Sequence, residues 1–381
     1  MTDSAILALV GDVMLGRGVS ALLRLREPQS FWGDVLPVLR SADAVIANLE
    51  SPITEAASEW RRSWKAFRFR AAPSAIEVLR AANIRCVNLA NNHALDYDER
   101  GLRETLDRLD AGGIAYAGAG RNLPGAVRPA LVDLGGMKLG LIGMTDTMPE
   151  FAAGPRRAGT NVQRIDDTVA SLGLIALQIG ELRRAGADTV VLSVHWGPNL
   201  RTSPPARFRR FARGAIELGV DIVHGHSAHL IQGVERWGSG LILYDTGNFL
   251  DDYWVFPGIR IDRSFVFLVE LRKGKPARLC MRPVKLKRGH VDLAVGTDFA
   301  STVATMRRRS RPFATPLLRT PQGLVVTWPS GEKEAPAGFA DRPLNPFMVP
   351  RSRLYDASPF PAQALKGRRE WPRNRRLACF G

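Results

Sequence analysis

The sequence has few cysteines and no long apolar run. Its three cysteines, Cys86, Cys280 and Cys379, stand far apart among 381 residues. Their number and spacing exclude a disulfide framework and a cysteine zinc motif, and they fit a reducing compartment, so we expect a cytoplasmic protein. No stretch approaches the roughly 18 consecutive apolar residues of a membrane span, and the N-terminus lacks the pattern of a secretion signal. We therefore expect no membrane span.

The charge of the chain is strongly positive and uneven. The net charge is +16, and residues 301–381 hold 15 Lys/Arg, 5 Asp/Glu and 11 of the 25 prolines. We expect residues 1–300 to form the main domain and residues 301–381 a basic extension that packs on it or trails from it. A basic surface attracts polyanions, but the chain shows no aromatic-interleaved nucleic-acid module, so nucleic-acid binding is not predicted.

Short apolar runs alternate with amphipathic helical patterns over the first 270 residues. This alternation predicts an α/β layered fold, and the nearly continuous apolar character of the runs predicts strands that are covered on both faces. The expected strands are 5–10, 43–48, 84–90, 114–119, 129–134, 138–144, 188–196, 220–225 and 241–247, and the expected helices are 73–82, 97–111, 165–185 and 205–218. After a further apolar run at 264–271 the pattern degrades.

Polar residues gather where these strands end. Three of the six histidines fall within residues 224–229, and another ends the run 188–196. In α/β sheets, ligands bind in the loops beyond the carboxyl ends of the strands. The residues in such positions are Asp12, Glu50, Asn91, Asn92, His93, His195, His224, His226, His229, Asp245 and Asn248.

Each of these residues alone has a structural explanation. Asp12 fits a turn, Asp96 is first interpreted as the cap of the helix expected from Tyr97, and Asp245 and Asn248 fit a loop. Independent structural causes would not place all the strand-end residues alike, so the joint pattern predicts a divalent metal site. Oxygen and imidazole ligands without thiolate suit Mn, Zn, Fe, Mg or Ca, and no organic cofactor is predicted.

The order of the motifs resembles the bacterial CapA family of poly-γ-glutamate capsule synthesis proteins, which are similar to calcineurin-type metallophosphatases. The segments that carry the resemblance are GDVMLGR (11–17), ANLESPIT (47–54), NLANNHALDYDERGLRETLDRLDAGGI (88–114), HWG (195–197), GVDIVHGHSAHLIQGVE (219–235) and YDTGNF (244–249). The resemblance implies an α/β fold: a four-layer αββα metallophosphatase-like sandwich, two β-sheets flanked by helices, with one or two metal ions at the strand ends. The basic, Pro- and Arg-rich C-terminal extension lies outside it.

The resemblance also implies roles for single residues. Asp12, Asn92 and His195 would bind metal, Glu50 would stand where metallophosphatases use a bridging aspartate, and His93 would act as general acid. Two of the three clustered histidines would complete the site, and the sequence leaves open which two of His224, His226 and His229 bind.

Further candidates complete the predicted site. Glu50 and Asp96 join His93 as candidate acid–base groups. Arg17, Asn91 and Asn248 are predicted to bind substrate.

The chain departs from the metallophosphatase pattern at three places. Asp12-Val13-Met14 lacks the histidine of the usual Asp-x-His, a glutamate replaces the bridging aspartate, and the histidines of GHSAH are spaced by two residues rather than one. These departures argue against phosphatase activity more than against metal binding.

Three functions are compatible with these residues. The first is a metal-dependent hydrolase or transferase acting on a phosphoester or on an amide-linked acidic polymer of the poly-γ-glutamate type. The second is a metal-dependent peptide epimerase, as in lasso-peptide maturation, in which paired acid–base groups exchange an α-proton. The third is a non-catalytic polyanion-binding protein. The expected partner is a peptide or an acidic polymer.

Overall fold

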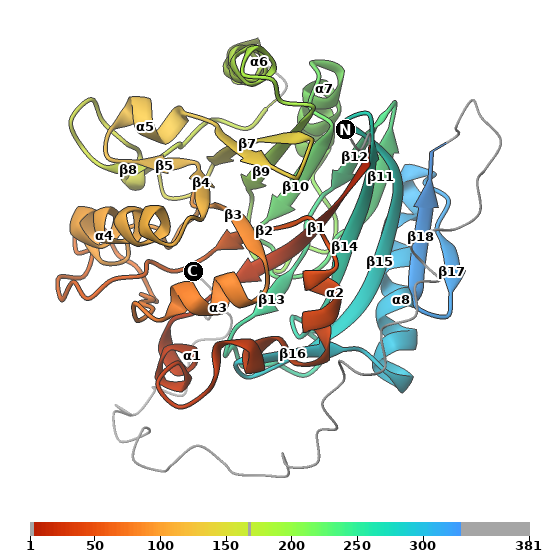
Figure 1. Ribbon diagram of the computed structural model, residues 1–381, viewed down its shortest axis with the longest axis horizontal. Coiled ribbons are helices and arrows are strands. Elements are labelled where there is room, and N and C mark those ends of the chain that lie inside the picture. The colour runs from red at the N-terminus through yellow and green to blue at the C-terminus, as the bar shows by residue number, and fades with distance from the viewer. Residues whose placement is uncertain (1–3, 167–168, 329–381) are drawn as a thin grey trace.

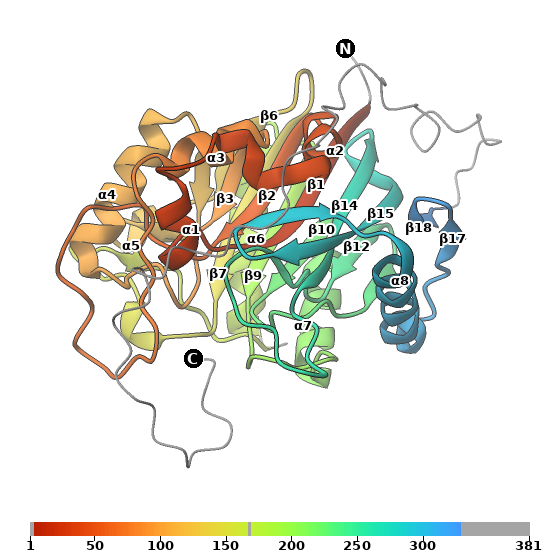
Figure 2. The ribbon, with the colours of Figure 1, turned by 90° about the horizontal axis from the view of Figure 1, so that it is seen from below.

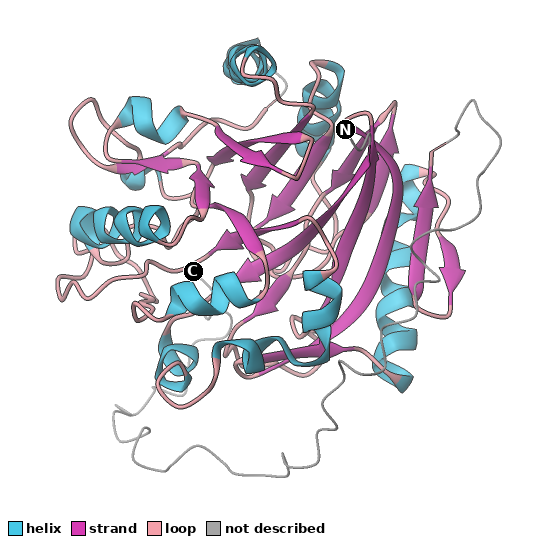
Figure 3. Cartoon of the chain, viewed as in Figure 1, coloured by secondary structure: helices cyan, strands magenta, loops and turns pink. Residues whose placement is uncertain are grey.

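Two β-sheets pack face to face, and helices cover their outer faces (Figures 1 and 3). The computed structural model describes residues 4–166 and 169–328. The apolar residues between the sheets form one core cluster, and a further cluster lies between each sheet and its helices. The expected four-layer αββα sandwich is therefore confirmed.

The larger sheet combines parallel and antiparallel strands. The strands β1 to β4 are parallel neighbours, and β14, β15, β18 and β17 extend the sheet beyond β1 as antiparallel strands. Two short strands join its sides, β13 beside β1 and β16 beside β15. The bounds are β1 Ser4–Val13, β2 Ala44–Leu49, β3 Ile84–Asn88, β4 Ala115–Ala117, β13 Asn248–Leu250, β14 Arg263–Arg272, β15 Lys275–Lys287, β16 His290–Leu293, β17 Leu318–Thr320 and β18 Gly323–Thr327.

The second sheet has the order β11-β12-β10-β9-β7-β6. Its four central strands are parallel, and hairpins add β11 and β6 at the two edges. The bounds are β6 Ala130–Asp133, β7 Lys138–Thr145, β9 Thr189–His195, β10 Ile222–His226, β11 Val234–Trp237 and β12 Gly240–Leu243, and a separate small sheet pairs β5 Ala119–Gly120 with β8 Gly159–Thr160.

Helices and 3-10 turns connect the strands and cover the sheets. The outer core cluster of the larger sheet includes residues of α2, α3 and α4, and that of the second sheet includes residues of α6 and α7. The bounds are α1 Arg17–Leu22, η1 Pro28–Val35, α2 Leu36–Arg40, α3 Ala75–Ala81, α4 Asp98–Ala111, α5 Leu123–Val127, η2 Pro149–Phe151, α6 Val169–Arg184, α7 Ala206–Glu217, α8 Gly296–Ser310 and η3 Arg311–Phe313.

The alternation of side chains along β10 directs its histidines inward. Ile222 belongs to the core between the sheets, and Val223 belongs to the cluster under the helices of the second sheet. Because successive side chains point to opposite faces of a strand, His224 and His226 share the face of Ile222. The two histidines therefore lie between the sheets, and both are fully buried.

The first part of the chain after residue 300 belongs to the folded domain. Residue 300 lies within α8, which runs beside β17 and β18 when the molecule is seen from below (Figure 2). The strand β18 pairs with β15, so residues up to Thr327 extend the larger sheet. Residues 329–381, which hold most of the predicted basic extension, lie outside the described part of the chain. Among the described residues, no helix has the length and apolarity to cross a bilayer.

Candidate metal centre

The predicted site residues come together where the parallel strands of the two sheets end. On β1, Asp12 is paired in register with Asn48 on β2 and with Asn248 on β13. In the second sheet, His195 at the end of β9 is paired in register with His226 at the end of β10. The Nδ1 atom of His226 lies 3.2 Å from Asp12 Oδ1, so the strand ends of the two sheets meet at this carboxylate.

The centre of the site is formed by Asp12, Glu50 and His229. One potential ligand atom of each lies within 4.8 Å of the others, and all three residues are buried. The Nδ1 atom of His229 lies 3.3 Å from Asp12 Oδ2 and 4.0 Å from Glu50 Oε2. Carboxylate oxygens and imidazole nitrogens at such spacing are a donor set for a divalent cation.

Several oxygen and nitrogen atoms that could bind a metal are buried in and around this cluster without a hydrogen-bond partner. They are Asp12 Oδ2, both carboxylate oxygens of Glu50, Asn92 Oδ1 and His226 Nε2. A buried polar atom without a partner costs free energy, and native proteins leave few of them. A bound cation would satisfy such lone pairs together, so the residues fit a metal ion.

Burial and charge shift the titration of the cluster. Burial, reinforced by the neighbouring Asp12 carboxylate, raises the pKa of Glu50 well above its usual value. Burial alone would lower the pKa of His229, but the Glu50 and Asp12 carboxylates outweigh it and raise that pKa to about 10. Both groups therefore hold a proton more firmly than usual, and a cation that binds them must displace protons.

We expect Mn²⁺ affinity to increase with pH. The raised pKa values of Glu50 and His229 mean that lower pH favours the protonated, non-ligating forms. Each displaced proton changes the association constant about tenfold per pH unit, over a window of roughly pH 6 to 9 that lies below the pKa of His229. Calorimetric titration in buffers of different ionisation enthalpy would count the protons released. An affinity that is constant across this window would contradict the assignment of these two groups as ligands.

A network of carboxamides positions Asp12. The Nδ2 group of Asn48 donates to Asp12 Oδ1 at 2.9 Å, and Asn48 Oδ1 accepts from Nδ2 of Asn88 and of Asn91 at 3.2 and 3.1 Å. Asn91 Nδ2 also donates to the Leu49 carbonyl, and Asn91 Oδ1 accepts from the backbone N–H of His93. Asn91 therefore ties the loop after β3 to β2, and both of its side-chain N–H groups are in use.

The loop that carries His229 is held in an unusual backbone conformation. Ser227 and His229 have φ values of 106° and 57°, a region that non-glycine residues seldom adopt. The Asp245 carboxylate accepts hydrogen bonds from the backbone N–H of Ala228 at 2.7 Å and of Gly247 at 2.8 Å, which anchors the loop. The interpretation of Asp245 as a loop-holding residue is therefore confirmed. Strained backbone of this kind concentrates at functional sites.

The remaining histidines of the second sheet differ in what they contact. His224 Nε2 donates to the carbonyl oxygen of Val10 at 3.0 Å, deeper between the sheets, and its ring lies 4.1 Å from that of His226. His195 Nδ1 lies 3.3 Å from Asn48 Nδ2, and burial lowers the pKa of His195 to about 3. His195 is therefore neutral at physiological pH, which is the form that binds metals. On β13, Asn248 Oδ1 accepts from His229 Nδ1 at 2.8 Å.

Beside the cluster, His93 forms a buried pair with Asp96. His93 Nδ1 donates to Asp96 Oδ2 at 2.6 Å, and the backbone N–H of Phe69 donates to the same oxygen. The helix α4 begins at Asp98, its N-cap residue is Tyr97, and no side chain caps it. The interpretation of Asp96 as a helix cap is therefore wrong, because its carboxylate is used to orient His93.

Two residues that sequence analysis does not identify contact the pair of His93 and Asp96. The buried Lys65 places Nζ 3.2 Å from Asp96 Oδ1 and donates to the Asn92 carbonyl at 2.5 Å. The ring of Phe69 stacks on His93 with centroids 4.0 Å apart. Both residues belong to the irregular segment 51–74, where no periodicity marks one of many basic or aromatic residues as buried.

Replacing Lys65 with methionine is expected to destabilise the fold. The substitution leaves the buried Asp96 carboxylate without its cationic partner, a change that costs about 3–5 kcal/mol of unfolding free energy in comparable sites. Urea denaturation of the variant would measure the loss. The matched control is Arg61→Met, which removes an exposed cation from the same segment and should change the unfolding free energy by less than about 0.5 kcal/mol. Equal stability of the two variants would contradict the ion pair.

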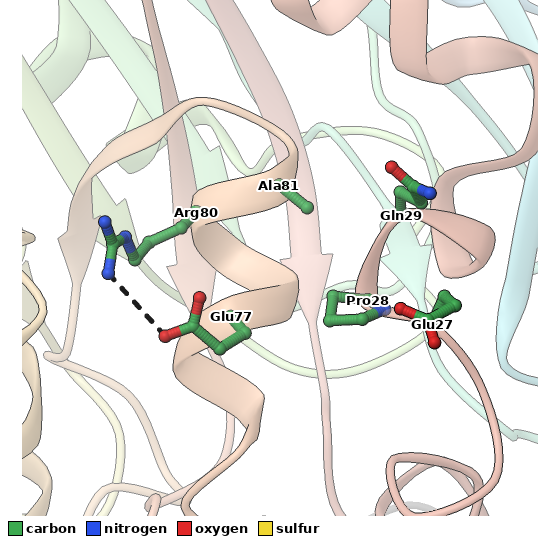
Figure 4. A pocket seen from close by; sticks show the side chains of 6 residues that line it. All are labelled: Glu27, Pro28, Gln29, Glu77, Arg80 and Ala81. Atoms are coloured by element: carbon green, nitrogen blue, oxygen red, sulfur yellow. Dashed lines mark ion pairs between the residues drawn. The ribbon is translucent and has the colours of Figure 1, made fainter.

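Two hollows on the surface differ in their relation to the site. One, of about 370 Å³, lies between η1 and α3, and none of its lining residues belongs to the cluster (Figure 4). The other, of about 330 Å³, is lined by Asp251, Tyr253 and Trp254 among others. The ring of Tyr253 lies 5.7 Å from that of His229, so this second cavity adjoins the metal centre.

Comparison with known proteins identifies relatives over most of the chain. The family model described as "Bacterial capsule synthesis protein PGA_cap" matches residues 6–253. A "Probable polyglutamine synthesis accessory protein" of Mycobacterium tuberculosis is 31% identical over 371 residues, 86% of this chain and 97% of the relative. The "Capsule biosynthesis protein CapA" of Bacillus anthracis is 26% identical over 288 residues, 74% of this chain and 68% of the relative.

Among solved structures, the sulfate thiohydrolase SoxB of Thermus thermophilus matches with a TM-score of 0.41 and 12% identity, over 81% of this chain and 60% of that one. This TM-score is too low to carry an argument about the site. The family model, in contrast, spans the segments that supply the clustered residues from Asp12 to Asn248. The chain belongs to the bacterial capsule synthesis protein PGA_cap family, in which the CapA proteins are its relatives.

Proposed function

We propose that this chain is a metal-dependent enzyme acting on an acidic polymer of γ-linked glutamate. It would hydrolyse the amide bonds of the polymer or transfer its γ-glutamyl groups to another amine. The observation that carries the proposal is the buried cluster of Asp12, Glu50 and His229, whose carboxylate oxygens include three without a hydrogen-bond partner. The polymer is inferred from the resemblance to poly-γ-glutamate capsule synthesis proteins, and the names of two relatives refer to capsule biosynthesis and to polyglutamine synthesis.

In this proposal four side chains hold the ion: Asp12, Glu50, His226 and His229. The Nδ1 atoms of His226 and His229 lie 3.2 and 3.3 Å from Asp12, and Nε2 of His226 has no hydrogen-bond partner, so these two histidines are favoured. His224 would instead support His226, since its ring donates to the Val10 carbonyl and packs against His226 rather than against the Asp12 or Glu50 carboxylate. Asn92 and His195 offer further neutral donors. A divalent ion bound there would polarise a carbonyl and acidify a water molecule.

His93 is proposed to move the proton that amide cleavage requires. Hydrolysis forms a bond from water oxygen to the carbonyl carbon, breaks the C–N bond and delivers a proton to the leaving amine. Asp96 accepts the Nδ1–H of His93, which leaves Nε2 for proton exchange with substrate. Burial lowers the pKa of His93 to about 4, although Asp96 opposes this shift, so His93 begins as a base at neutral pH.

The proposal is tested with Mn²⁺- or Zn²⁺-loaded protein and a γ-linked glutamate oligomer in heavy water. Mass spectrometry would show shorter or longer oligomers if the amide bond is cleaved or transferred. Phosphate release from aryl phosphates, with the oligomer unchanged, would contradict the proposal in favour of a phosphatase. Deuterium at an α-carbon of an oligomer of unchanged length would contradict the proposal in favour of a peptide epimerase. Binding of the oligomer without any reaction would contradict it in favour of a non-catalytic polyanion-binding protein.

A further inference from the structure

The side chain of Arg17 lies at the edge of the metal centre among aromatic rings. Arg17 is the first residue of α1, four positions after the end of β1, which supplies Asp12, and its φ of 52° is in the left-handed region. Such a conformation is unfavourable for a non-glycine residue and is found preferentially at functional sites. Its side chain is 42% exposed.

Three aromatic rings surround the guanidinium. Its Cζ lies 6.0, 5.9 and 6.0 Å from the ring centroids of Phe67, Phe69 and Tyr253. Phe69 stacks on His93, and Tyr253 lies edge-on to the ring of His229. The two rings therefore connect Arg17 with both halves of the site, the metal ligands and the acid–base pair.

The guanidinium of Arg17 has no close polar partner within the described part of the protein. Arg17 makes no hydrogen bond there, and its one ion pair is a 3.5 Å contact with Asp252 Oδ1. The other oxygen of Asp252 accepts from the backbone N–H of Gly18 at 2.9 Å. In contrast, Arg68 and Arg70 of the nearby segment 51–74 donate to backbone carbonyls, so their role is to hold that segment.

We propose that Arg17, Phe67, Phe69 and Tyr253 form a carboxylate-binding subsite beside the metal centre. A planar guanidinium with free N–H groups matches a carboxylate through two parallel hydrogen bonds. The rings hold the guanidinium by cation–π contact without neutralising its charge. Asp252 is a distant partner that an incoming carboxylate displaces. The inference rests on the proposed function: the subsite takes a free α-carboxylate of the γ-linked polymer, near the amide bond presented to the metal.

The subsite is tested by the affinity of a γ-linked glutamate tetramer for the full chain, measured calorimetrically with and without Mn²⁺. We expect Arg17→Met to weaken binding roughly 10-fold to 100-fold, because it removes hydrogen bonds to a charged group. The matched control, Arg61→Met, removes an exposed arginine from segment 51–74 and should change the dissociation constant less than about twofold. A γ-linked isoglutamine tetramer, in which carboxamides replace the pendant α-carboxylates, should bind both variants alike.

A second variant tests the competition with Asp252. Asp252→Asn keeps an acceptor for the Gly18 N–H but removes the negative charge near Arg17, so the tetramer should bind several-fold more tightly. Equal affinity of Arg17→Met and the unaltered chain, weaker binding by Asp252→Asn, or no binding of the tetramer by the unaltered chain would overturn the subsite. Stronger competition by inorganic phosphate than by the tetramer would also overturn it, in favour of a phosphate site.

Failure of the subsite and failure of the proposed function are distinguishable. If Arg17→Met binds metal and tetramer as the unaltered chain does, the subsite is wrong and the metal centre is untouched. If the unaltered chain binds tetramer through Arg17 but takes up no divalent metal, the subsite stands and the proposed enzyme does not.

Discussion

An Asp12→Ala protein is expected to lose the metal that the unaltered chain binds. Asp12 contacts His226 and His229 through different carboxylate oxygens, and Asn48 fixes its orientation. Its removal therefore deletes one ligand and the group that aligns two others. Because loss of an outer-shell partner alone costs 10-fold to 100-fold in metal affinity, we expect a loss of at least about 100-fold here. Elemental analysis after gel filtration would measure it, and turnover should fall with metal content.

His290→Ala is the matched control for this experiment. His290 lies on β16, where its Nδ1 donates to the Ser30 carbonyl and its Nε2 contacts Asp292, with no link to the cluster. The variant removes an imidazole but should keep the metal of the unaltered chain. Full metal content in Asp12→Ala, or equal losses in the two variants, would show that the cluster is not the binding site.

The second large effect is expected from His93→Gln, which should lower turnover while leaving the metal bound. His93 is held by Asp96 and Phe69 rather than by the carboxylates of the cluster. Loss of a positioned acid–base group lowers the rate about 10²-fold to 10⁴-fold. Steady-state kinetics together with elemental analysis of the same sample would separate the two effects.

Two results would contradict this role. If metal and activity disappear together in His93→Gln, His93 acts as a ligand. If turnover is unchanged, another group transfers the proton. Asp96→Asn gives a further comparison, because the amide can still face His93 Nδ1 but no longer carries the charge that pairs with Lys65. It should reduce turnover and stability together.

The fold of the first 270 residues follows from the sequence because its strands are buried on both faces. The apolar runs 5–10, 138–144 and 188–196 correspond to β1, β7 and β9, and the expected helices correspond to α3, α4, α6 and α7. The strand β15 was not predicted, because Arg278, Arg282 and Lys285 interrupt its apolar residues. These cations stand at intervals of four and three residues rather than two, and Pro276 and Pro283 also interrupt the strand, so the period of a strand is hard to recognise.

The sequence identifies most residues of the site, but it does not identify what each side chain contacts. Strand ends identify Asp12, Glu50 and the histidines, but no sequence pattern tells which imidazole faces a carboxylate and which a backbone carbonyl. Asn48 lies inside the apolar run 43–48, and a carboxamide in an apolar strand is a signal of a buried polar contact. Lys65 and Tyr253 depend on how irregular segments fold over the site, which local patterns do not encode.

The most direct test is anomalous diffraction from crystals of the full chain grown with Mn²⁺ or Zn²⁺. We expect a strong peak between the two sheets, within about 2.0–2.3 Å of oxygen or nitrogen atoms of Asp12, Glu50 and His229. Peaks confined to surface residues, with these three side chains bonded only to protein or water, would contradict it.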